Sequence, residues 1–183
     1  MRAVIVVDML RGFLEPGHPL FGGDACRAII PATRALLERE RSAGSLLVFL
    51  ADTHDPDDLE FEMFAPHCVR GTPECEVIPE LADLAGGAIT VPKRRYSGFF
   101  DTPLDVILRD RDVTEVVVVG VMTDICVLHT AADLRNRDYP TTVASDCVAS
   151  FDRSQHDFAL GHIRSILGAR VVTSGELEPA AAR

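Results

Sequence analysis

The sequence EVVVVGVMTDICVLHTAA, residues 115–132, opens with an uninterrupted run of four valines at 116–119. A run of β-branched residues without a polar interruption is typical of a strand that is buried on both faces of a parallel sheet. Gly120 follows the valines and is expected to end this strand. The stretch therefore predicts a fully buried strand that leads directly into a helix-like segment.

The residues after this strand place a cysteine at the start of a helix. Thr123 or Asp124 can cap a helix that begins near Ile125, which puts Cys126 in the first helical turn. Unpaired backbone N–H groups and the helix dipole favour an anion there, and such a setting lowers the pKa of a thiol. Cys126 is therefore a candidate nucleophile. The alternative is a small buried apolar side chain, the commoner role of a free cysteine.

Strand-like and helix-like segments alternate along the rest of the chain. The expected strands cover residues 3–7, 46–50, 88–91, 116–119, 141–144 and 170–172. The expected helices cover residues 24–42, 76–84, 103–110, a segment from 125 onward, and 154–167, with Asp24, Asp101 and Ser154 as caps. This alternation predicts an α/β fold, a three-layer αβα sandwich with a mainly parallel six-stranded sheet.

The composition restricts the class of protein. A length of 183 residues, 47% of them hydrophobic, fits one domain over residues 1–183, with residues 174–183 as a loose C-terminal tail. A net charge of −10 disfavours nucleic acid and anionic membranes as partners. The sequence has no apolar run near the ~20 residues that span a bilayer and no signal-peptide layout, so we expect a cytoplasmic protein. A homo-oligomer, a dimer or higher, is also expected.

Reactive side chains follow four consecutive strands. Asp8, Asp52 and Lys93 stand at strand ends, and Cys126 stands one turn beyond the valine strand. Ligands of open α/β sheets bind beyond these carboxyl ends. Asp8 can take the proton of the thiol, while Lys93 can stabilise a thiolate and orient the carboxylate. Backbone N–H groups around Met122 and Cys126 can form an oxyanion hole.

Lys93 is unusual for a compositional reason as well. Of the 18 lysine and arginine residues, 17 are arginines, and Lys93 is the one side chain with an ammonium group. Lysine is a compact charge whose pKa responds to its surroundings, whereas arginine stays protonated. This difference favours a functional role for Lys93 over the chance survival of a surface lysine.

A metal site is predicted around the end of the second strand. Asp52 and His54 lie two residues apart and project to the same side of an extended segment. His67 follows thirteen residues later, with Glu60 and Glu62 in between. Such a set suits one divalent ion, Zn²⁺ first and Mn²⁺ or Fe²⁺ as alternatives. The competing interpretation is that these are ordinary surface histidines of a long loop at residues 53–74.

Five motifs cover most of the chain. They are VVDMLRGF at 6–13, DTH at 52–54, PHCVRGTP at 66–73, PKRRYSGFFDTPLD at 92–105 and GVMTDICVLHTAADLRNRDY at 120–139. Together they resemble the isochorismatase-like cysteine hydrolases, and within them the nicotinamidase/pyrazinamidase branch, from residue 3 to about residue 172. This resemblance implies a catalytic triad of Asp8, Lys93 and Cys126. It also implies a cis peptide between Val121 and Met122, with the N–H groups of Met122 and Cys126 forming the oxyanion hole.

The resemblance also implies ligands and a substrate pocket. The metal ligands of the family fall on Asp52, His54 and His67, and Glu60 occupies the position of a further ligand in some nicotinamidases. The residues implied to bind the substrate are Phe13, Phe64, Tyr96 and Val121. The implied partner is a small pyridine carboxamide whose ring nitrogen binds the metal directly.

The resulting hypothesis is a nicotinamidase that converts nicotinamide, and also pyrazinamide, to the acid and ammonia through a thioester on Cys126. One alternative is another amide hydrolase of the same superfamily that acts on a ureido or carbamoyl compound. A different class, a phospho-receiver signalling domain, is disfavoured because the chain is too long and lacks an acidic pair after the first strand. A dinucleotide-binding domain is disfavoured because the first turn, DMLRGF, has no GxGxxG.

Overall fold

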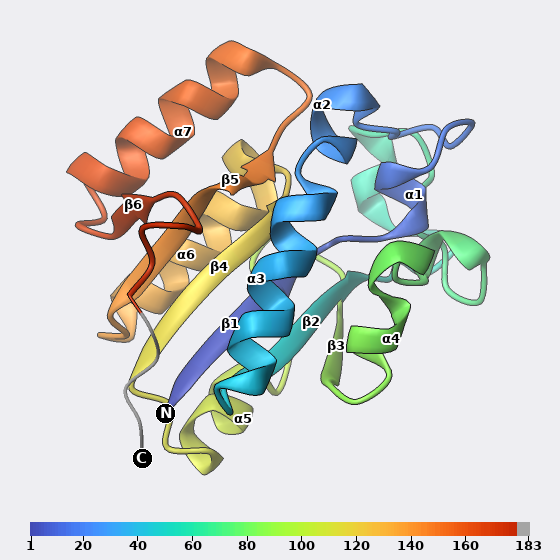
Figure 1. Cartoon of the computed structure of the whole chain (residues 1–183). Coiled ribbons are helices and arrows are strands. Elements are labelled where there is room, and N and C mark those ends of the chain that lie inside the picture. The colour runs from blue at the N-terminus through green and yellow to red at the C-terminus, as the bar shows by residue number, and fades with distance from the viewer. Residues whose placement is uncertain (179–183) are drawn as a thin grey trace.

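The six predicted strands form one sheet in which every pair of neighbours is parallel, in the order β3-β2-β1-β4-β5-β6. The computed structural model describes residues 1–178. The strands are β1 (Arg2–Val7), β2 (Leu46–Asp52), β3 (Ile89–Lys93), β4 (Glu115–Val121), β5 (Thr141–Ala149) and β6 (Arg170–Val172). The predicted α/β fold is therefore confirmed, with β1 and β4 at the centre of the sheet (Figure 1).

Helices cover both faces of this sheet and complete three layers (Figure 1). The helices are α1 (Arg11–Leu14), α2 (Gly23–Arg27), α3 (Ile30–Ser42), α4 (Ala82–Ala85), α5 (Leu104–Asp110), α6 (Leu128–Asn136) and α7 (Arg153–Ser165). Short 3₁₀ turns occupy η1 (Leu59–Glu62), η2 (Pro73–Cys75) and η3 (Pro79–Leu81), and a π-helical turn, η4, occupies Thr123–Val127. Helices α1 to α4 pack on one face, and α5, α6 and α7 pack on the other.

Strand β1 shows how the sequence divides the core between the two faces. Val4 and Val6 pack against the α3 side, whereas Ala3, Ile5 and Val7 pack against the α5 and α6 side. All five side chains are fully buried. Alternation along a strand whose two faces are both covered explains the continuous apolar run in the sequence.

Strand β4 continues through Gly120 to Val121, so the predicted end of this strand at Gly120 is wrong. Gly120 has a φ of +112°, and a Cβ added there would lie 2.0 Å from the carbonyl oxygen of Val7. Glycine therefore lets β4 pass close to β1 without leaving the sheet. The predicted fifth strand is likewise too short, because β5 runs on to Ala149 through a register shift against β4.

The predicted cap of the next helix is also wrong. Helix α6 is preceded by the π-helical turn η4, and neither Thr123 nor Asp124 caps it. The hydroxyl of Thr123 instead hydrogen-bonds His156 Nδ1 at 2.9 Å, and Asp124 accepts a hydrogen bond from Ser150. These two side chains attach the turn to α7 and to Ser150, which follows β5, so they are not free to cap their own helix.

Other helix boundaries differ for local reasons. The helix predicted over 24–42 is two helices, α2 and α3, because Pro31 lies in the first turn of α3 and has no N–H to continue an earlier helix. Asp152 replaces Ser154 as the cap of α7, since its carboxylate accepts the Gln155 N–H at 3.0 Å. Helix α5 begins at Leu104, whose N–H binds the hydroxyl of Thr102, and Asp101 does not cap it.

The predicted loose tail is packed in its described part. Ser174 donates from both its backbone N–H and its hydroxyl to Asp146 at 2.6 Å, and Leu177 is buried. The backbone of Glu178 accepts a hydrogen bond from Arg2 at 2.8 Å. Residues 179–183 of the predicted tail lie outside the described residues.

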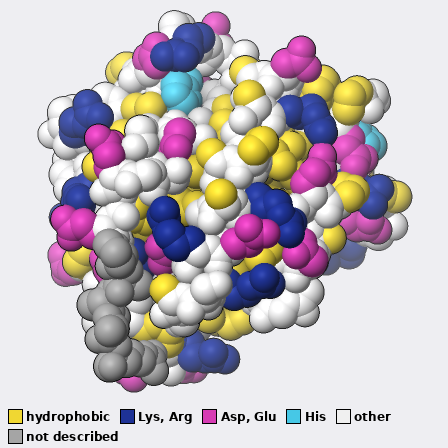
Figure 2. Space-filling model, viewed as in Figure 1, with side chains coloured by type: hydrophobic (Ala, Val, Ile, Leu, Met, Phe, Trp, Pro, Cys, Tyr) yellow, Lys and Arg dark blue, Asp and Glu magenta, His cyan; other side chains and the backbone are white. Residues whose placement is uncertain are grey.

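The surface mixes both signs of charge. On the face in Figure 2, acidic and basic side chains are interspersed over the helices and loops. No helix within residues 1–178 is long and apolar enough to cross a membrane.

Candidate active site

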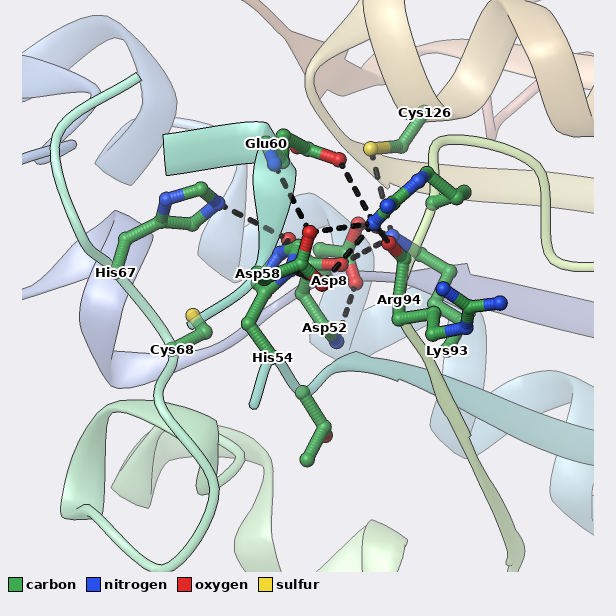
Figure 3. Close-up of polar contacts among 12 residues, drawn as sticks. Asp8, Asp52, His54, Asp58, Glu60, His67, Cys68, Lys93, Arg94 and Cys126 are labelled. Atoms are coloured by element: carbon green, nitrogen blue, oxygen red, sulfur yellow. Dashed lines mark hydrogen bonds and ion pairs between the residues drawn. The ribbon is translucent and has the colours of Figure 1, made fainter. Parts of the chain in front are cut away.

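The three predicted catalytic side chains meet at the carboxyl ends of β1, β3 and β4 (Figure 3). Lys93 Nζ lies 2.8 Å from Asp8 Oδ2 and 3.5 Å from Cys126 Sγ. All three side chains are buried. Asp8 is also fixed from the neighbouring strand, because the Asp52 N–H donates to Asp8 Oδ1 at 3.0 Å. Parallel strands thus bring together residues that lie far apart in the sequence.

Lys93 neutralises two carboxylates at once. Its Nζ also lies 3.0 Å from Asp52 Oδ1, so the ammonium stands between Asp8 and Asp52. Burial alone would lower the pKa of Lys93, but the charges of Asp52 and Asp8 more than offset this and hold the pKa well above its usual value. Lys93 is therefore a fixed positive charge in the site.

The two aspartates have opposite pKa shifts. Burial raises the pKa of Asp8 to about 6, although Lys93 partly opposes the shift. Burial also acts to raise the pKa of Asp52, but Lys93 and the hydrogen bonds from His54 and His67 hold that pKa well below its usual range. Asp52 therefore stays ionised, while Asp8 is placed to exchange a proton near neutral pH.

The structure contradicts the expected low pKa of Cys126. Burial raises the pKa of this thiol well above its usual value, and the nearby charges of Asp8 and Asp52 add to the effect, against the opposing charge of Lys93. The helix-terminus argument did not include these two carboxylates. The resting side chain is therefore a thiol. It needs a neighbouring proton acceptor to become a nucleophile, and Asp8 is the candidate for this role.

A second cluster lies beside this triad. One ligand atom from each of Asp52, His54 and His67 falls within 4.8 Å of the others, and all three residues are buried. Nε2 of His54 and of His67 lie 3.1 and 3.3 Å from Asp52 Oδ2. The structure thus gathers three of the four predicted metal ligands, with Glu60 adjacent on η1 (Figure 3).

The chemistry of this donor set fits a divalent cation. Nδ1 of His67 faces the Ala65 carbonyl at 2.9 Å, and Nδ1 of His54 faces an Asp58 carboxylate oxygen at 3.0 Å. Both partners only accept hydrogen bonds, so each Nδ1 donates to its own partner. Nε2 of each ring faces Asp52 Oδ2 and donates to it, and a bound cation would take the place of the Nε2 proton while Nδ1 keeps its partner. Glu60 Oε2 is buried and accepts no hydrogen bond within residues 1–178. Two imidazoles and the carboxylates supply the nitrogen and oxygen ligands that zinc prefers.

A mainly apolar cavity that opens to solvent connects the two clusters, and the empty space in it, open solvent included, is about 360 Å³. Cys126 and Asp8 line one part of it, and Asp52, Glu60 and His67 line another. The predicted substrate residues Phe13, Phe64, Tyr96 and Val121 all contribute to its walls, as does Met122. Leu20, Ile125 and Phe151 also line the cavity and were missed by the sequence reasoning.

The comparisons with known proteins identify the family. An isochorismatase domain matches residues 2–176. The chain belongs to the isochorismatase family.

Solved structures show which members of the isochorismatase family this protein resembles. Pyrazinamidase/nicotinamidase from Streptococcus mutans superposes with a TM-score of 0.90 at 35% identity, covering 94% of this chain and 100% of the other. N-carbamoylsarcosine amidase from Thermoplasma acidophilum gives 0.87 at 35%, over 97% and 98%. Pyrazinamidase of Pyrococcus horikoshii in complex with zinc gives 0.87 at 31%, over 94% and 98%. The predicted resemblance to the nicotinamidase branch is confirmed.

This isochorismatase-family hydrolase has the groups that acyl transfer needs. Cys126 is a candidate nucleophile and Asp8 a candidate proton acceptor, and Lys93 is a positive charge in contact with both. The backbone contains the cis peptide bond between Val121 and Met122 that the family resemblance implied. Met122 and Cys126, whose N–H groups were predicted to form the oxyanion hole, both line the cavity.

Proposed function

We propose that this protein is a nicotinamidase that hydrolyses nicotinamide, and also pyrazinamide, to the carboxylic acid and ammonia. The observation that carries the proposal is the lining of the cavity. Within residues 1–178, it includes the acidic side chains of Asp8, Asp52 and Glu60 but no lysine or arginine. An uncharged aromatic amide suits such a cavity, whereas the carboxylate of a substrate would meet these acidic side chains with no lysine or arginine of the described lining to pair with, only the cation proposed below.

The first half of the proposed reaction forms a thioester. Asp8 accepts the thiol proton of Cys126, and the sulfur attacks the carboxamide carbon. The N–H groups of Met122 and Cys126 donate to the oxyanion, and each such donor contributes roughly 3 kcal/mol in comparable enzymes. Asp8 then returns its proton to the departing ammonia. Lys93 keeps the carboxylate in place and offsets the developing negative charge.

The second half releases the acid. Asp8 takes a proton from water, the resulting hydroxide attacks the thioester carbon, and Cys126 leaves as a thiol after recovering that proton. Asp52, His54 and His67, with Glu60 as a further ligand, would hold one divalent cation. Zinc is the favoured ion, since the Pyrococcus horikoshii relative was solved with it. When bound, the ion would supply a Lewis acid for a ring nitrogen of the substrate.

The second candidate is an amidase for a carbamoyl compound. It is favoured by the similarity to N-carbamoylsarcosine amidase, which is as high in identity as the best nicotinamidase match reported above, 35% in both cases. The described lining argues against it, because it offers the carboxylate of N-carbamoylsarcosine no lysine or arginine besides the proposed cation.

The test is turnover of purified, zinc-loaded protein with nicotinamide, pyrazinamide and N-carbamoylsarcosine in parallel. Nicotinate formation, followed by chromatography together with ammonia, is the expected result, and Cys126→Ala abolishes it. Cys147→Ala is the matched control, because Cys147 is also a buried free cysteine but lies away from the cavity. Ammonia from N-carbamoylsarcosine alone would establish the second candidate instead.

A further inference from the structure

A second layer of charged side chains stands behind the proposed cation ligands. His54 Nδ1 donates to Asp58 Oδ2 at 3.0 Å (Figure 3), and the side chain of Asp58 is 5% exposed. Arg95 Nη1 in turn lies 2.9 and 3.0 Å from the two carboxylate oxygens of Asp58. The same guanidinium nitrogen lies 3.6 Å from Glu60 Oε2. One arginine therefore touches the support of one proposed ligand and the carboxylate of another.

The carboxylate of Asp58 accepts hydrogen bonds from both His54 and Glu60. Its Oδ2 accepts from Nδ1 and fixes the ring orientation of His54, so that Nε2, which faces Asp52, is the nitrogen that would bind a cation. Its Oδ1 accepts the N–H of Glu60 at 2.9 Å and so caps the turn that carries Glu60. The position of Asp58 thus decides how both His54 and Glu60 are presented, and Arg95 holds Asp58.

We propose that Arg95 is a positioning residue that sets the affinity of the cluster for a divalent cation through Asp58 and Glu60. The inference rests on the proposed function, because it assumes that Asp52, His54 and His67 hold such an ion. Arg95 does not ligate the ion and does not line the cavity. It acts by fixing the geometry of groups that do.

The direction in which cation affinity changes when Arg95 is removed distinguishes positioning from electrostatic repulsion. An arginine close to a cation site repels the cation, so removal of its charge alone would tighten binding. Removal of a group that orients the ligands weakens binding, typically about 10–100-fold for residues in this outer layer. A loss of affinity on removal of Arg95 would therefore show positioning, and a gain would show simple repulsion.

Arg94 offers a matched control. It is the preceding residue, carries the same charge, and pairs with Asp101 at 3.3 Å on the exposed surface. Arg95→Gln and Arg94→Gln thus change the net charge of the protein equally. Only the first of them removes a contact to Asp58 and Glu60.

The experiment measures the affinity of full-length, metal-free protein for Zn²⁺ alone, by competition with a chromophoric chelator. Arg95→Gln is expected to weaken binding about 10–100-fold, while Arg94→Gln stays within about twofold of the parent. Introducing Arg95→Gln into an Asp58→Asn background is expected to add little, because the two residues act through one another. Unchanged or tighter binding by Arg95→Gln would overturn the proposal.

A second variant covers the case in which Arg95→Gln does not fold. Arg95→Lys keeps the charge but loses the planar guanidinium, so it is also expected to weaken Zn²⁺ binding, and parent-like affinity would count against positioning. The assay contains no substrate. Failure of nicotinamide turnover would therefore leave this result intact, whereas a parent protein without measurable Zn²⁺ affinity would overturn this inference whatever amide is hydrolysed.

Discussion

Lys93 shows at the scale of one residue why a chain rich in arginine keeps a lysine. Its ammonium makes three contacts of 2.8–3.5 Å with Asp8, Asp52 and Cys126 in a fully buried space. Lysine places a compact charge there with three donors that can point in different directions. The planar fork of arginine suits one carboxylate in the plane, not two carboxylates and a sulfur arranged around a point.

The pH dependence of turnover is a prediction about Asp8. Its pKa is raised to about 6, chiefly by burial, so Asp8 gains a proton as the pH falls through that value. Protonated Asp8 cannot accept the thiol proton of Cys126. We therefore expect kcat/KM for nicotinamide to fall about tenfold per pH unit below 6.

The measurement is a pH–rate profile with zinc content determined at each pH. The zinc determination is needed because acid also releases a cation from histidine ligands. A profile that stays level down to pH 5 with zinc retained would contradict the role of Asp8 as the base.

Residues at strand ends were predictable, whereas several cavity residues were not. Asp8, Asp52 and Lys93 follow apolar runs, and parallel strands must bring their carboxyl ends together. Leu20 and Phe151 lie in connecting loops without a helical or strand pattern of hydrophobic residues. The sequence therefore gives no signal that these side chains line the cavity. The raised pKa of Cys126 was missed because it depends on two carboxylates from other strands.

At the scale of elements, the pairing of β4 with β1 depends on Gly120. A Cβ at this position would lie 2.0 Å from the Val7 carbonyl oxygen, a distance that no side-chain movement can relieve. The φ of +112° adds a conformational cost for any other residue. Gly120→Ala is therefore expected to lose more than about 4 kcal/mol of unfolding free energy or to fail to fold.

Gly161→Ala is the control for this prediction. Gly161 lies inside α7, and an added Cβ would meet no atom within 4 Å. The same substitution there is expected to be neutral or to stabilise by up to about 1 kcal/mol, because alanine favours a helix. Urea denaturation of both variants provides the comparison, and similar losses in the two would refute the close-contact explanation.

The type and order of the six strands could be predicted, but helix α1 was missed, the helix over 24–42 is divided into α2 and α3, and the ends of several elements differ. The hydrophobic pattern of a strand is visible within a short stretch of sequence, so all six strands were located. Caps depend on competition between partners: Asp152 reaches the Gln155 N–H of α7, while Thr123 binds His156 on α7 and Asp124 binds Ser150, which follows β5. Such choices are made by tertiary contacts, which a local pattern does not contain.

For the whole molecule, the proposed cation would add a link between the end of β2 and the connection that follows it, which are already joined by the backbone hydrogen bonds from His54 to Cys68 and from Arg70 to His54, at 2.9 and 2.8 Å. Asp52 ends β2, His54 follows it, and His67 lies in the long connection to β3. An ion bound only by the folded state stabilises by about 2.7 kcal/mol at a free concentration of 100 Kd. Addition of Zn²⁺ to metal-free protein is therefore expected to raise the unfolding temperature measured by scanning calorimetry.

Histidine variants separate this effect from non-specific zinc binding. His67→Asn is expected to abolish most of the shift, whereas His162→Asn, on the outer helix α7, is expected to retain it. Equal shifts in both variants would mean that zinc binds elsewhere.

The buried ion pair of Arg2 and Glu40 is a second contact that joins distant parts of the chain. The side chains are 5% and 1% exposed and lie 3.2 Å apart, and they connect β1 with α3. Arg2 also contacts Glu115 at the start of β4 and the backbone of Glu178. Glu40→Ala leaves the arginine charge buried with less compensation, and we expect a loss of roughly 3–5 kcal/mol in urea denaturation.

The double variant Arg2→Met/Glu40→Leu removes both charges and keeps apolar volume in their place. It is expected to recover most of the stability lost by Glu40→Ala, because the main cost of the single variant is an unpaired buried charge and not the absence of attraction. The exposed pair of Arg153 and Asp157 is the control, since Arg153→Ala is expected to change stability by less than about 0.5 kcal/mol. If the double variant were as unstable as Glu40→Ala, the pair would have to contribute through its own attraction and its hydrogen bonds to the C-terminal segment.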